Sequence, residues 1–135
     1  MPPMKMLHTQ DPKKEIFDKL GMREGTIPGF SLQGNRVLIA IYLRPKVTAS
    51  GIHLADTTRA EDEHQGKAAL IVALGPTAFV SDERVQFDDA EVLRVGDWVA
   101  AFVSHGLKCS VNGVSCRIIR DQDLAMKIPA PDAVW

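Results

Sequence analysis

Short apolar segments alternate with turn signals from Asn35 to Ile128, and this spacing limits what the chain can fold into. Each segment has about the length of one strand, and the turn signals recur about every 8–12 residues. A helical domain would instead place apolar residues three or four positions apart over longer stretches. The spacing therefore predicts an all-β fold, a small barrel or sandwich, for residues 35–128.

Apolar patterning also indicates individual strands. Alternation begins at Arg36 and predicts a strand with one core face, and the continuous apolar run Ala68–Leu74 indicates a buried strand. Further strands are expected from Trp98 to Val103 and in residues 124–128, where apolar residues again alternate. The side chains that we expect to face inward are Val37, Ile39, Ile41, Ile71, Val99 and Ile119.

Two hairpins are predicted. Asn112-Gly113 is typical of a type I′ turn and would place Cys109 opposite Cys116. A Cα separation of about 5.5 Å for such a pair permits a disulfide, whereas a reduced thiol pair is the interpretation that a cytosolic setting favours. A second hairpin is expected where segments 79–81 and 85–87 flank a polar turn at 82–84.

Residues 1–34 form an N-terminal extension unlike the rest, and residues 129–135 form a short tail. In the extension Asp11 can cap a short helix, Pro12 suits its first position and Gly21 can end it. Two turns are marginal alone, so this helix must dock either on its own barrel or on a neighbouring subunit. Its apolar face, a candidate secondary contact, consists of Ile16, Phe17 and Leu20.

A long polar segment, residues 46–65, interrupts the strand pattern. About twenty residues without evident structure are unusual inside a compact domain, and such loops are commonly functional or disordered. The centre of the segment, the candidate partner-binding site, holds Gly51, Ile52, His53 and Leu54. Its apolar pair could dock on a partner or pack locally under a static loop.

Composition and motifs point away from several other functions. The 16 Lys and Arg residues against 17 Asp and Glu give a net charge of -1, which offers no basic footprint for nucleic acid or a membrane surface. No apolar run approaches the ~20 residues of a membrane span, and the first residues lack a signal-peptide pattern. The histidines and cysteines have no zinc-site spacing, and nucleophile and phosphate-loop motifs are absent. We therefore expect a cytoplasmic protein that is not an enzyme and has no catalytic residues, cofactor or metal.

Five short motifs follow one another in a fixed order: Asn35-Arg36-Val37, the loop with Gly51-Ile52-His53-Leu54, Gly66-Lys67 before the run 70–76, Val95-Gly96-Asp97-Trp98-Val99, and Arg120-Asp121-Gln122-Asp123-Leu124-Ala125. In this order they resemble the GroES-type co-chaperonin family, also called chaperonin-10. The resemblance covers roughly seventy per cent of the chain.

The resemblance implies a GroES-like β-barrel subunit that forms a seven-membered homo-oligomeric ring and caps a chaperonin, so that proteins fold in a closed chamber. Residues 46–65 would be the mobile loop of the family. Ile52 and Leu54 would then enter a hydrophobic groove on the chaperonin apical domain.

Departures from the family pattern indicate a divergent member, and a viral origin is one interpretation. The family normally begins at its first strand, whereas 34 residues precede Asn35 here, and His53 occupies the centre of the usual apolar tripeptide. The alternative function is therefore a viral capsid decoration or cement protein built on the same barrel. Its partner would be a major capsid protein, and its location the virion surface.

Overall fold

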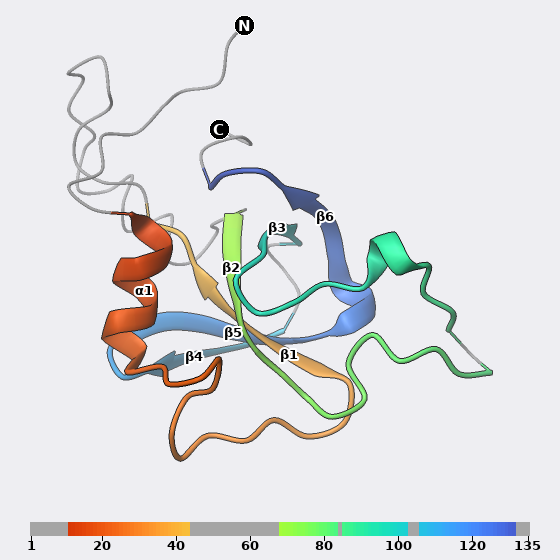
Figure 1. The fold of residues 1–135 in the computed structure, drawn as a ribbon, viewed down its shortest axis with the longest axis horizontal. Coiled ribbons are helices and arrows are strands. Elements are labelled where there is room, and N and C mark those ends of the chain that lie inside the picture. Colours follow the sequence, from red (N-terminus) through yellow and green to blue (C-terminus); the bar gives the residue numbers. More distant parts are fainter. Residues whose placement is uncertain (1–10, 44–67, 84, 103–105, 132–135) are drawn as a thin grey trace, which may run out of the picture.

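The computed structural model describes residues 11–43, 68–83, 85–102 and 106–131 (Figure 1). Strands dominate this part of the chain, which confirms the prediction of a small all-β fold preceded by a short helix. No helix in the described ranges is long and apolar enough to cross a membrane. The elements, in chain order, are α1 (Pro12–Leu20), β1 (Arg36–Ile41), β2 (Ala68–Leu74), η1 (Asp89–Glu91), β3 (Trp98–Ala101), β4 (Leu107–Val111), β5 (Val114–Arg120), η2 (Asp121–Asp123) and β6 (Leu124–Ile128).

All six strands belong to one antiparallel sheet in the order β4-β5-β1-β2-β3-β6. The sheet is strongly curved, and β6 arches across one of its ends (Figure 1). A bulge between Leu38 and Ile39 shifts the register of β1 against β2, and such bulges bend a strand. Within the described residues β4 and β6 are the edges of the ladder, so each has one side without a strand partner.

Both faces of β1 are buried, so the prediction of a single core face was wrong. The face with Val37, Ile39 and Ile41 belongs to what we call the inner cluster, together with Ile71, Val99 and Ile119. This confirms that the six predicted side chains face inward. The opposite face carries Leu38, Ala40 and Tyr42, which belong to a second cluster. Because that face is covered as well, the strand is apolar from Val37 onward.

The helix α1 covers the second face of the sheet (Figure 1). It begins and ends as predicted: the Asp11 side chain accepts a hydrogen bond from the Lys13 N–H (3.0 Å), and Gly21 ends it in the left-handed conformation at φ 68°. Leu20 is 0% exposed and lies with Ile27 in the helix-side cluster, our name for this second cluster. The other members of the cluster come from the sheet and from Tyr42, the residue that follows β1: Leu38, Ala40, Tyr42, Ala68, Leu70, Val72, Trp98, Val111, Val114, Cys116 and Ile128.

The Asn112-Gly113 hairpin has the predicted register. Both residues adopt positive φ, 50° and 82°, as a type I′ turn requires, and Cys109 lies opposite Cys116. The Asn112 side chain also donates a hydrogen bond from Nδ2 to the Leu20 carbonyl (2.9 Å). The tip of the hairpin therefore satisfies one of the free carbonyls at the end of α1.

The prediction of a second hairpin was wrong, because the described residues from Phe79 to Phe87 contain no strand. Their polar side chains bond to the local backbone instead. Asp82 Oδ1 accepts from the Val85 N–H (2.9 Å), and Ser81 Oγ accepts from the Phe87 N–H (2.9 Å). The strand expected from Trp98 to Val103 is also shorter and ends at Ala101.

Candidate functional site

The candidate partner-binding residues, Gly51, Ile52, His53 and Leu54, lie outside the described residues. The structure does show the two ends from which their segment departs. Ile41 of β1 is paired with Ala69 of β2, and the Tyr42 N–H donates to the Ala68 carbonyl (2.9 Å). The segment thus leaves and re-enters the sheet at adjacent points, which we call the stem.

Aromatic packing holds the stem in place. The rings of Tyr42 and Trp98 meet edge to face, with centroids 5.9 Å apart and planes at 71°. Both residues are buried in the helix-side cluster. Aromatic pairs in this geometry contribute about 0.5–1.5 kcal/mol beyond their buried area. The stem is therefore a well-packed base for the segment that it supports.

A buried cation lies on the other face of the sheet near the stem. Arg117 lies two positions before Ile119 on β5, so both side chains point to the same face of the sheet, that of the inner cluster. The Arg117 side chain is 1% exposed. Its Nη1 donates to the carbonyl of Phe102 (3.5 Å), the residue that follows β3. Burial lowers the pKa of the Arg117 guanidinium, because an apolar setting disfavours the charged form. Sequence reasoning missed this residue, since an arginine in a strand normally suggests a solvent-facing position.

The candidate secondary contact lies on α1. Leu20 is in the core, and Ile16 and Phe17 are partly buried against the same cluster. The helix therefore docks on the sheet of its own chain, which is one of the two docking surfaces that the sequence left open. A contact between the exposed parts of Ile16 and Phe17 and another subunit stays a prediction.

A second polar centre lies at the other end of β1, around a buried carboxylate. Asp121 is 5% exposed. Its side chain accepts hydrogen bonds from the Phe79 N–H (2.9 Å) and from Asn35 Nδ2 (3.2 Å), while its own N–H donates to the Asn35 carbonyl (3.1 Å). Phe79 has a positive φ of 60°, which is uncommon for a bulky residue. We call these three residues the Asp121 junction.

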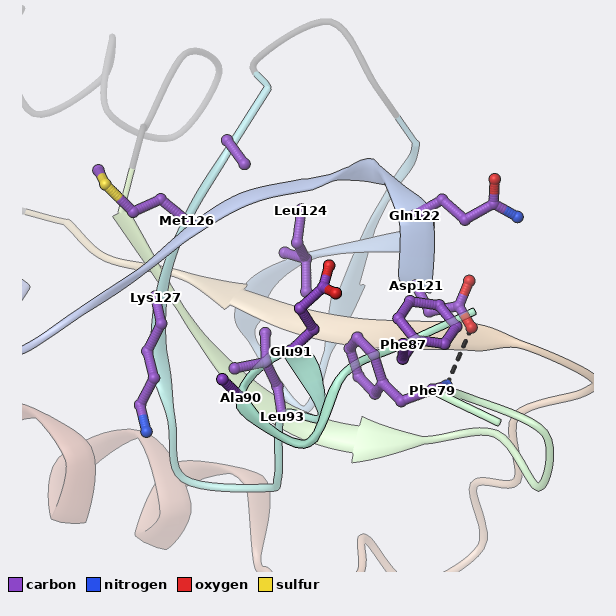
Figure 2. A pocket seen from close by; sticks show the side chains of 11 residues that line it. Phe79, Phe87, Ala90, Glu91, Leu93, Asp121, Gln122, Leu124, Met126 and Lys127 are labelled. Carbon is purple, nitrogen blue, oxygen red and sulfur yellow. Dashed lines mark hydrogen bonds between the residues drawn. The ribbon is translucent and has the colours of Figure 1, made fainter. Parts of the chain in front are cut away.

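A cavity of about 220 Å³ adjoins this junction (Figure 2). Phe79 and Phe87 line it, with their rings edge to face at 5.5 Å. Its carboxylates already have internal partners, because Asp121 binds the Phe79 N–H and Glu91 binds the Asp88 N–H (3.1 Å). Among the residues that the structure describes, no three His, Cys, Asp or Glu side chains are placed to hold a metal ion. The arrangement suits packing between η1, η2 and β6 better than chemistry on a bound substrate.

Comparisons with known proteins agree with the motif order. Residues 30–128 match the model of the family described as Chaperonin 10 Kd subunit. The chain is also similar to two proteins named Co-chaperonin GroES, from Caldicellulosiruptor saccharolyticus and Caldicellulosiruptor bescii. Each is 32% identical over 91 residues, which cover 67% of this chain and 87% of the relative. The family match spans all six strands and leaves α1 outside it.

Proposed function

Because this chain belongs to the chaperonin-10 family, we propose that it is a co-chaperonin subunit that assembles into a ring, caps a chaperonin and assists protein folding in the cytoplasm. The observation that carries the proposal is the family match over residues 30–128, which coincides with the sheet and includes the segment between β1 and β2. The proposed role is that of a lid without catalytic chemistry of its own.

The docking element that we propose is the apolar pair Ile52 and Leu54, flanked by Gly51 and His53. The packed stem supports this proposal, since it anchors both ends of the segment side by side. Each aliphatic side chain contributes about 1.5–3 kcal/mol if it is fully buried on a chaperonin apical domain. One such contact is modest and reversible, and a ring of subunits multiplies it by avidity.

Ring formation is supported by the two edges of the sheet. Strands β4 and β6 carry backbone groups on their outer sides that can pair with another chain. Each edge also exposes a large apolar side chain, Leu107 at 65% and Met126 at 53%. Two different edges on one subunit suit head-to-tail contacts, which form a ring when the rotation from one subunit to the next closes. The seven-membered size rests on the family resemblance.

The alternative is a capsid decoration or cement protein, which would use the N-terminal helix and the loop, residues 46–65, as clamps on a viral shell. The apolar face of α1 packs on the protein's own sheet, so the structure gives this alternative no added support.

The proposed function is tested by a double substitution in the loop, Ile52→Asp with Leu54→Asp. We expect chaperonin binding in the presence of ATP to be lost, because charged side chains cannot enter an apolar groove without a large desolvation cost. The melting temperature should change by no more than a degree or two, because both residues lie amid polar residues, outside any strand pattern of the sequence. Sedimentation velocity with a purified chaperonin measures the first quantity, and thermal unfolding measures the second.

The matched control is Thr57→Asp with Thr58→Asp, which adds the same charge to the same segment. It should bind like the native protein. Unfolding of the Ile52/Leu54 variant would show that the pair belongs to a core. A folded variant with undiminished binding would remove the loop from the docking site.

A further inference from the structure

The two cysteines form a cross-strand pair in the β4–β5 hairpin. Val111 and Val114 close the two-residue turn as a hydrogen-bonded pair, so Cys109 and Cys116, two positions further along each strand, form another. Cα atoms in such pairs are about 5.5 Å apart, which lies within the range that a disulfide spans. Both side chains point to the same face of the sheet, since Val111 and Val114 share their parity and lie in the helix-side cluster.

The two thiols differ in their access to solvent. Cys116 is 2% exposed, whereas Cys109 is only partly buried, and both are free thiols in the structure. Burial raises the pKa of Cys116 to about 12, and the nearby Cys109 adds to this rise because two thiolates would repel each other. Burial also raises the pKa of Cys109. The pair thus has one thiol that reagents can reach and one enclosed thiol directly opposite it.

We propose that Cys109 and Cys116 are a redox pair that forms a reversible disulfide by exchange with a low-molecular-weight disulfide such as glutathione disulfide. The Cys109 sulfur, after losing its proton, attacks one sulfur of glutathione disulfide and releases one glutathione thiolate. The Cys116 sulfur then loses its proton, attacks the Cys109 sulfur and releases the second. Two protein thiols are oxidised to one disulfide, glutathione disulfide is reduced to two glutathione molecules, and the two protons pass to them.

A disulfide between Cys109 and Cys116 would stabilise the structure at this position in the sheet. Strand β4 is an edge of the sheet and pairs only with β5 among the described residues. The tip of the same hairpin holds the end of α1 through the bond from Asn112 to Leu20. A covalent link across the hairpin therefore secures both the edge strand and the support of the helix.

The test uses the full chain in glutathione buffers of increasing oxidised fraction. We expect a species lighter by two hydrogen atoms, with no thiol that iodoacetamide can alkylate after denaturation, and full reversal by dithiothreitol. Because the link closes a short loop in the unfolded chain, the oxidised protein should melt about 5 °C higher or more. A bond between subunits would instead double the mass.

Two single variants isolate the pair. Cys109→Ser should leave Cys116 unmodified and the melting temperature independent of the buffer. Cys116→Ala should accumulate one glutathione adduct on Cys109. The proposal is overturned if the native protein in fully oxidised glutathione retains two alkylatable thiols, stops at a glutathione adduct, or forms only bonds between subunits. Both variants keep Ile52 and Leu54 unchanged, so chaperonin binding can be measured separately from disulfide formation.

Discussion

The carboxylate of Asp121 joins three segments that are far apart in the sequence. It accepts from the Phe79 N–H and the Asn35 amide, and it lies directly after the last residue of β5. A buried carboxylate that accepts hydrogen bonds is a strong local partner, because the bonds are charge-assisted. The Asp121 junction therefore fixes the start of β1 against the segment after β2.

Asp121→Ala should lower the free energy of unfolding by about 2–4 kcal/mol, because it leaves a buried N–H at Phe79 without its acceptor. Urea denaturation measures the loss. The control is Asp89→Ala, on the exposed turn η1, which should change stability by about 0.5 kcal/mol or less. Equal losses for the two variants would show that the junction does not stabilise the fold.

Sequence reasoning reached the segment of Asp121 but not its role. The residues from Arg120 to Ala125 were recognisable as a motif, and nothing in them indicates a bond to Phe79, 42 positions away. Long-range partners of a polar side chain are set by topology. Arg117 illustrates the same point, because its strand neighbours Cys116 and Ile118 lie in or against the helix-side cluster, and only the pairing of β5 with β1 places Arg117 on the inner face.

At the scale of elements, local chemistry predicted the bounds of α1 and the register of the β4–β5 hairpin. A cap at Asp11, a glycine at position 21 and the Asn112-Gly113 turn each act within a few residues. The second buried face of β1 could not be predicted, since the helix that covers it lies elsewhere in the chain. The hairpin expected at 79–87 failed because polar side chains bind the backbone that a ladder would use.

Leu20→Ala tests whether α1 is part of the core. We expect the free energy of unfolding to fall by about 2–5 kcal/mol, because the fully buried side chain leaves a cavity between helix and sheet. Chemical denaturation gives the value, and Lys14→Ala on the exposed face of α1 is the control. A loss below about 0.5 kcal/mol would mean that the helix contributes little, and that residues 35–128 form a domain without it.

At the scale of the molecule, the sheet ends in two different edges, and the proposed ring uses them. Met126→Lys on β6 should reduce the particle to smaller species, because a charge on an edge strand opposes pairing with another chain. The melting temperature of the isolated subunit should stay the same, since Met126 is half exposed. Sedimentation velocity reports the particle mass. The control is Gln86→Lys, which makes an equal charge change at an exposed position before η1 and should leave the particle mass unaltered. If the Met126→Lys variant still forms an intact ring, the contact between subunits lies elsewhere.

The double burial of the central strands also determines how the protein exchanges its amide hydrogens with solvent. β1 and β2 have a strand on either side and an apolar layer above and below, so deuterium reaches their N–H groups only when the whole sheet opens. β4 and β6 lie at the margins and open by local fraying. The slowest amides of β1 and β2 therefore report the global stability of the subunit. The amides of the edge strands β4 and β6 report contacts made at those edges.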